Sequence, residues 1–173
     1  MGPVGWPRRG ARVLAGLFAS LAAACAQPAT PAGMNAESIA EMLRAHNELR
    51  SARKIRPLKW SASLAESAQQ WAEHLAAIGV MQHNLELRTG QNLYVIHGAT
   101  TRPALVVRRW AEESRDYREP EKYCRLGAIC GHFTQIIWAE TEEVGCGVAS
   151  GERGQFWVCY YLPPGNVVGE KPY

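Results

Sequence analysis

Residues 131–141 read GHFTQIIWAET, and they are the most distinctive segment of this chain. The segment mixes apolar and β-prone residues, so its pattern fits either a strand or a short helix. We interpret it as a short helix. The segments on either side of it determine the predicted fold class.

Three longer amphipathic helices are predicted before this segment, because apolar residues recur there at spacings of three and four. Asn35 can cap the first helix, and Gly79 can end the second. Ser63, followed by Glu66 three residues later, forms a capping box at the start of the second helix. The predicted ranges are approximately 36–53, 64–78 and 102–117.

Strands are predicted in the remaining segments. Residues 91–97 are β-prone, and residues 144–149 and 155–162 flank the turn sequence SGERG, which indicates a hairpin. Helices interspersed with mostly antiparallel strands place the protein in the α+β class.

The first 24 residues are predicted to be a cleavable export signal. Three arginines (Arg8, Arg9 and Arg12) precede the twelve-residue apolar run VLAGLFASLAAA. Small residues follow this run, as at an export cleavage site. Twelve apolar residues are too few to span a bilayer core, which needs about 20.

The net charge of +3 resides entirely in this leader. Subtracting its three arginines from the 19 Lys and Arg leaves 16 basic residues against 16 acidic ones in residues 25–173. A neutral domain is atypical of a nucleic-acid binder or a polybasic membrane-surface domain. We therefore expect no nucleic-acid partner.

Residues 25–33 are predicted to be a flexible low-complexity linker, and residues 34–173 a single domain of about 140 residues. Cys25 lies where a bacterial lipobox cysteine would lie, so a membrane tether at Cys25 is an alternative to free secretion. The expected location is extracellular, or periplasmic or lipid-anchored in a bacterium. We expect a monomer.

Four cysteines remain in the predicted domain, and an even number in an exported domain indicates two disulfides with three possible connectivities. We favour Cys124–Cys130, which closes a short loop, and Cys146–Cys159, which joins the two predicted hairpin strands. A structural zinc site is the weaker alternative, because no CxxC occurs and export favours oxidation.

The sequence contains no HExxH, GxSxG, P-loop or dinucleotide-binding motif. Its densest polar patch is HNELR at residues 46–50, where His46 and Arg50 are one helical turn apart. This patch is either part of a site or, as we prefer, an internal hydrogen-bond network that fixes the first helix.

Four segments resemble motifs of the CAP superfamily, which comprises cysteine-rich secretory proteins, insect antigen 5 and pathogenesis-related class 1 proteins. The long ones are GHFTQIIWAET at 131–141 and FWVCYYLPPGNV at 156–167, where Tyr160 departs from the usual polar residue. The short ones are HNELR at 46–50 and GQNL at 90–93. The matching motif residues are His46, Asn47, Arg50, Asn92, Gly131, Gln135, Trp138 and Asn166.

The resemblance implies a three-layer α-β-α sandwich around a small, mostly antiparallel sheet. It also implies a central cleft formed by His83, Gln91, Glu113 and His132. At Gln91 the family normally has glutamate, so this chain lacks one carboxylate that could act as a base or bind a cation.

The resemblance further implies a non-enzymatic extracellular module that binds a lipid or protein partner in the cleft or in an adjacent apolar groove. No cofactor is required. Weak binding of a divalent cation such as zinc by His83 and His132 is an alternative. A second alternative is a metal-assisted hydrolase that uses these histidines with Glu113, although we favour a protein without enzymatic activity.

Overall fold

The structure is a computed structural model that describes residues 1–2 and 33–173. A four-stranded sheet lies at the centre of the domain. The strand order is β1-β5-β6-β2, and only the β1–β5 pair is parallel. This arrangement confirms the α+β class and the mostly antiparallel sheet. The strands are β1 (Lys59–Trp60), β2 (Gly90–Ile96), β5 (Glu143–Gly151) and β6 (Gly154–Leu162).

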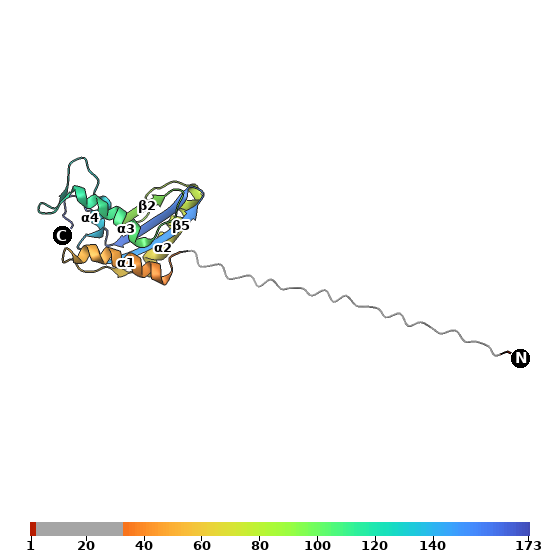
Figure 1. The fold of residues 1–173 in the computed structure, drawn as a ribbon. Helices are drawn as coiled ribbons and strands as arrows, with labels where there is room; N and C mark the ends of the chain where they lie inside the picture. Colours follow the sequence, from red (N-terminus) through yellow and green to blue (C-terminus); the bar gives the residue numbers. More distant parts are fainter. Residues whose placement is uncertain (3–32) are drawn as a thin grey trace. The chain divides into compact units, whose positions relative to one another are not determined.

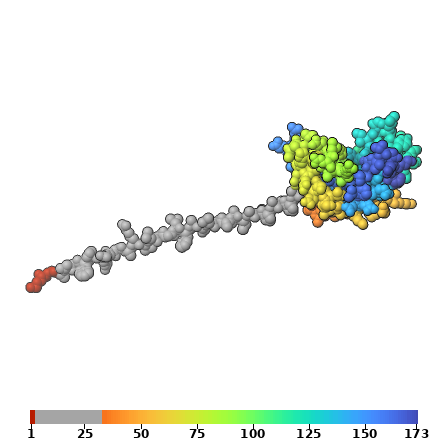
Figure 2. Space-filling model, turned by 180° about the vertical axis from the view of Figure 1, so that it is seen from behind, coloured from red at the N-terminus to blue at the C-terminus, as the bar shows by residue number. Residues whose placement is uncertain are grey.

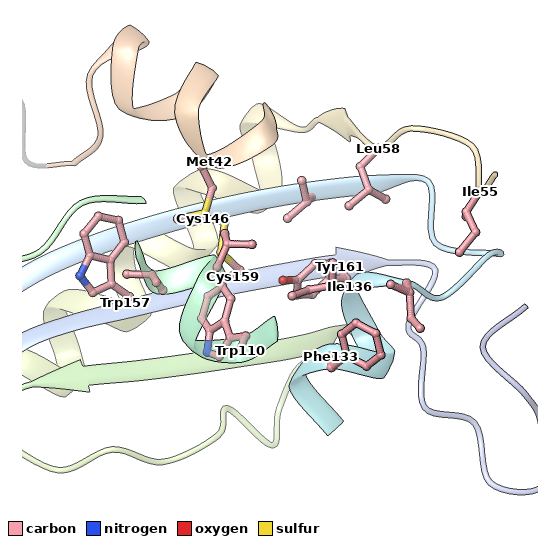
Figure 3. Close-up of a cluster of buried hydrophobic side chains, with 14 of the residues drawn as sticks. Met42, Ile55, Leu58, Trp110, Phe133, Ile136, Cys146, Trp157, Cys159 and Tyr161 are labelled. Atoms are coloured by element: carbon pink, nitrogen blue, oxygen red, sulfur yellow. A yellow bond between two sulfur atoms is a disulfide. The ribbon is translucent and has the colours of Figure 1, made fainter. Parts of the chain in front are cut away.

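Helices cover both faces of the sheet and complete the three layers (Figure 1). Side chains of a strand alternate between the two faces, and β6 shows this directly. Trp157, Cys159 and Tyr161 pack with the core on one face, together with residues of α1, α3 and α4 (Figure 3). Phe156, Val158 and Tyr160 pack with α2 on the other. The helices are α1 (Ala36–Ser51), α2 (Ala62–Ile78), α3 (Pro103–Ala111) and α4 (Gly131–Ile136).

Helix α2 lies unusually close to β5 because glycines face it. A Cβ atom added to Gly147 would lie 2.3 Å from the Cα of Gln69, and one added to Gly145 would lie 2.2 Å from the backbone N of Ala65. Gln69 itself accepts a hydrogen bond from the backbone N–H of Val148 (2.9 Å) and donates one to its C=O (3.0 Å). In the view from behind, the α2 region (yellow) forms part of the surface (Figure 2).

The structure corrects the ends of the predicted helices. The first helix ends at Ser51 rather than at residue 53. The second helix begins at Ala62 rather than at residue 64, because the backbone oxygen of Ser61 already accepts the N–H of Ala65 (3.0 Å) as the first helical hydrogen bond. The capping box at Ser63 is therefore wrong. The third helix ends at Ala111 and continues as the 3₁₀ helix η1 (Glu112–Asp116), so its predicted α-helical extension to residue 117 is wrong.

A small two-stranded sheet, which the sequence patterns did not predict, follows η1. It pairs β3 (Tyr117–Arg118) with β4 (Tyr123–Cys124). The last residues of the chain lie beside it, because Lys122 donates a hydrogen bond to the backbone oxygen of Tyr173 (2.5 Å) and its ammonium lies 4.3 Å from the centre of the Tyr173 ring. Both views show this end of the domain next to the C-terminus (Figures 1 and 2).

The predicted export signal, the predicted linker and Cys25 fall on residues 1–33, of which the structure describes only residues 1, 2 and 33. They remain predictions. In the described part of the chain, no helix has the length and apolar character needed to cross a membrane.

Candidate functional site

Glu113 and His132 form a tightly bonded pair at the start of α4. The Oε2 atom of Glu113 accepts hydrogen bonds from the backbone N–H groups of His132 (2.9 Å) and Phe133 (3.2 Å). Its Oε1 atom lies 2.6 Å from Nδ1 of His132. A carboxylate only accepts, so Nδ1 carries the proton and Nε2 is left as the acceptor nitrogen of a neutral His132. The ring also stacks against Trp110, with centroids 6.1 Å apart.

His83 and Gln91 form a second pair, near the end of α2. Nδ1 of His83 lies 3.3 Å from Oε1 of Gln91, and the same oxygen accepts the backbone N–H of Asn84 (3.0 Å). The Nε2 atom of Gln91 donates to the backbone C=O of Asn84 (2.7 Å). His83 is exposed, whereas Gln91 is half-buried at the start of β2.

Strand β2 connects the two pairs. Gln91 bonds the segment after α2, whereas its neighbour Asn92 donates to the backbone oxygen of His132 in α4 (3.0 Å). Gln91 and Asn92 are consecutive, so their side chains leave β2 toward opposite faces of the sheet. No hydrogen bond among the described residues joins one pair directly to the other.

The histidines and Glu113 do not come together as a set of three zinc ligands in the described part of the chain. Within residues 1–2 and 33–173, no group of three or more His, Cys, Asp or Glu side chains could hold a metal ion. Zinc sites in proteins usually have at least three such ligands. Gln91 contributes only an amide oxygen, which already accepts hydrogen bonds, whereas Nε2 of each histidine makes no hydrogen bond with another described residue.

The His132–Glu113 pair could orient a general base, but no nucleophile accompanies it. Among the described residues, no Ser, Thr or Cys side chain forms a hydrogen bond with His83 or His132. The four described cysteines are all in disulfides: Cys124–Cys130 and Cys146–Cys159, as predicted. The described residues therefore show no nucleophile for covalent catalysis beside either histidine. A metal-assisted hydrolase needs none, so that alternative stays a prediction.

The polar patch of α1 is buried and bonded inside the protein. Nε2 of His46 lies 2.8 Å from the hydroxyl of Tyr161, and Nδ1 lies 2.8 Å from the backbone oxygen of Met42. Burial lowers the pKa of His46 to about 4, so the ring is neutral at physiological pH. Asn47 bonds both the N–H (2.7 Å) and the C=O (3.0 Å) of Leu58.

Arg50 is the centre of a second buried network. Its guanidinium donates to four backbone oxygens, at 2.7–2.9 Å, and its side chain is completely buried. Burial, reinforced by nearby Arg56, lowers the pKa of Arg50 to about 10, so it is still charged at neutral pH. The acceptors belong to Arg56, Ile136, Trp138 and Thr141.

The motif residues of α4 and of the C-terminal loop bind each other. Gln135 accepts the backbone N–H of Gly165 (2.9 Å), and Asn166 donates to the backbone oxygen of Gly131 (2.9 Å). Trp138 is buried in the core. The contacts of these residues fasten residues 165–166 to α4.

A groove between α1 and α3 was not marked by any sequence motif. It has a volume of about 410 Å³ and is separate from the histidine pairs. The spacing of apolar residues along the two helices was the one signal for the groove. The same spacing also predicts a buried helix face. The lining residues are Ala45, Glu48, Leu49, Ala52, Arg102, Ala104, Leu105, Val107, Arg108 and Ala111.

Comparison with known proteins identifies the family to which this fold belongs. Residues 43–161 match the profile of the Cysteine-rich secretory protein family, CAP. The chain belongs to the CAP family. It is 35% identical to a pathogenesis-related protein PR-1 type from Sambucus nigra over 130 residues, which cover 75% of this chain and 78% of the relative.

Two further CAP relatives show how far the similarity extends. Peptidase inhibitor 16 from Bos taurus is 33% identical over 175 residues, covering 93% of this chain but 37% of that protein. The structure of BmVAL-1 superposes with a TM-score of 0.69, covering 83% of this chain and 84% of that one at 24% identity, which supports the fold alone. This CAP protein is PR-1-like, and its two disulfides and the secreted PR-1 relatives fit an extracellular protein.

Proposed function

We propose that this protein is a non-enzymatic extracellular binding module whose α1–α3 groove holds the acyl chain of an anionic lipid. The groove is the observation that supports this proposal. Its volume of about 410 Å³ falls within the range of small-molecule sites, about 300–1,000 Å³.

Alanines on both helices leave room for the groove. Ala45 and Leu49 of α1 and the C-cap residue Ala52 follow one another at spacings of four and three, so they share one stripe. Ala104 and Ala111, seven residues apart, face the groove from α3. Small side chains along facing stripes keep the floor low and apolar, which suits a flexible hydrocarbon chain.

Charged residues border the apolar floor. Arg102 reaches Glu41 of α1 (3.4 Å) and thereby links the two helices at one end. Arg108 lines the groove, is exposed, and forms no salt bridge with another described residue. A guanidinium beside an apolar floor is suited to a lipid carboxylate or phosphate, because Arg binds both in a bidentate manner.

A fluorescent fatty acid titrated into the purified protein tests the proposal. We expect saturable binding that Ala104→Trp weakens at least about tenfold, because the indole would fill the groove. Ala77→Trp is the matched control, since Ala77 is an exposed residue of α2 outside the groove. Circular dichroism checks that both variants fold.

A second pair of variants tests whether the groove requires a charged lipid headgroup. Arg108→Gln should weaken binding of the fatty acid but not binding of the corresponding fatty alcohol. Arg109→Gln should change the binding of neither ligand, because Arg109 lies outside the groove and pairs with Glu112 (3.2 Å). If no fatty acid or phospholipid saturates the protein, or if Ala104→Trp binds normally, the groove does not bind lipid. A protein partner would then be the remaining interpretation of this surface.

A further inference from the structure

The amide of Gln91 bonds both backbone groups of Asn84 at once. It accepts the N–H of Asn84 (3.0 Å) and donates to its C=O (2.7 Å). A side-chain amide carries a donor and an acceptor side by side, as a peptide group does. Gln91 therefore binds Asn84 in the way that a neighbouring strand residue would.

The same two-way arrangement occurs twice more in this fold. Asn47 bonds the N–H and C=O of Leu58, and Gln69 bonds the N–H and C=O of Val148. In each case the side-chain amide joins a helix or strand to the backbone of another segment. The repetition makes Gln91 one of three amide clamps in the described residues.

A carboxylate at position 91 could not make the same contact. It could accept the N–H groups of Asn84 and His83, but it has no donor for the C=O of Asn84, which lies 2.7 Å from the Nε2 atom of Gln91. Two oxygens at that distance would repel each other. A glutamate there would have to turn away, take up a proton or bind a cation.

The neighbouring residue Gln82 is fixed by a separate hydrogen bond. The indole Nε1 of Trp71, in α2, donates to the backbone oxygen of Gln82 (3.0 Å). Residues 82–84 are thus tied to α2 by Trp71 and to β2 by Gln91. His83 lies between these ties, and its bond to the acceptor oxygen of Gln91 places the ring proton on Nδ1.

We infer that Gln91 is a positioning residue that fixes His83 and residues 82–84 in one conformation without a bound cation. The absence of any three-ligand metal group among the described residues agrees with this role. Gln91 replaces the charge of a carboxylate with a hydrogen-bond donor, so the loop is stabilised by the protein alone. This inference is independent of lipid binding in the groove.

The substitution Gln91→Glu tests the inference, with Zn²⁺ alone as the probe. The wild-type protein should have the same Tm in EDTA and in Zn²⁺. Gln91→Glu should melt lower in EDTA, by on the order of 5 °C, because the C=O of Asn84 loses its partner. Zn²⁺ should raise the Tm of this variant, and calorimetry should show binding at least about tenfold tighter than to wild type.

Gln82→Glu is the matched control, because it adds the same charge in the same loop at an exposed side chain. It should melt like wild type and gain no Zn²⁺ dependence. The inference is overturned if Gln91→Glu keeps the wild-type Tm in EDTA, or if wild type binds Zn²⁺ as tightly as the variant.

Imidazole ¹⁵N NMR gives a readout that a general loss of stability would not change. Neutral His83 should be the Nδ1–H tautomer in wild type and in Gln82→Glu. In Gln91→Leu, which has no acceptor, the ring should shift toward the Nε2–H tautomer that predominates in free histidine. An Nε2–H tautomer in wild type would also overturn the inference.

Discussion

At the scale of single residues, Arg50 is a buried cation that carbonyl dipoles stabilise instead of a carboxylate. Two of its four acceptors, the backbone oxygens of Ile136 and Trp138, lie at the C-terminal end of α4, where the helix dipole favours positive charge. The HNELR pattern predicted an internal network at this place. It could not predict the acceptors, because backbone oxygens distant in sequence carry no residue signature.

His46 should make the stability of the protein depend on pH. Its pKa is about 4 in the folded protein, mainly because of burial, against 6.5 as the ordinary value. The unfolded chain therefore binds a proton first as the pH falls. Stability is fully present above pH 6.5 and is lost between about pH 6.5 and 4, by up to about 3 kcal/mol. Urea denaturation across this range measures the loss.

The variant His46→Gln should remove this part of the pH dependence, although it will be less stable at pH 7. Exposed His74 provides the matched control. His74→Gln should retain the wild-type slope between pH 6.5 and 4. An unchanged slope in His46→Gln would show that another group is responsible.

At the scale of elements, the contact between α2 and β5 depends on glycine. The sequence predicted the helix and the strand with small errors at their ends. It did not predict that the helix and the strand would pack so closely. The sequence GCG at residues 145–147 shows that small residues are present, but it does not show which segment packs against them. The backbone of Gln69 occupies that space.

Gly147→Ala should therefore destabilise the protein, although alanine is usually the milder replacement. The new methyl group would lie 2.3 Å from the Cα of Gln69, and neither backbone can move without disturbing the layer. We expect a loss of about 1–3 kcal/mol in the free energy of unfolding, measured with urea. Exposed Ser150 lies in the same strand, and Ser150→Ala should stay within about 0.5 kcal/mol of wild type. Equal stability of the two variants would refute the close packing.

At the scale of the whole molecule, the two disulfides stabilise different regions. Cys146–Cys159 joins β5 to β6 in the buried core, whereas Cys124–Cys130 closes a loop near the surface. The exposed residues of that loop include Leu126 and Ile129. The pairing was predictable from spacing, because one pair closes a short loop and the other flanks a hairpin.

Removing the core disulfide should cost more than removing the loop disulfide. Chain entropy gives about 2–3 kcal/mol for each. Replacing both Cys146 and Cys159 by alanine should lose more than this, because a buried bridge also contributes packing in the core. The Cys124→Ala/Cys130→Ala variant should lose close to the entropic value. Urea denaturation of the two double variants measures the loss in the free energy of unfolding. Equal losses in the two variants would contradict the prediction.

The candidate site was less predictable from sequence than the fold. Motif resemblance named the histidine, acid and amide positions, but it did not show that they form two separate hydrogen-bonded pairs, each linked to β2. That result depends on which residues of the strand point to which side, and on the backbone of Asn84. No sequence motif indicated the groove between α1 and α3, because the groove results from small alanine side chains and alanine is common in any helix.

The clamp between Gln69 and Val148 has a consequence for how copies of this protein meet. Strand β1 pairs with β5 only at Glu143 and Val144, so the remaining length of β5 is an edge that could recruit a strand from another molecule. At Val148 the amide of Gln69 already fills both positions that an incoming strand would need. The amide of Gln69 thus closes this edge of β5 to an incoming strand at Val148.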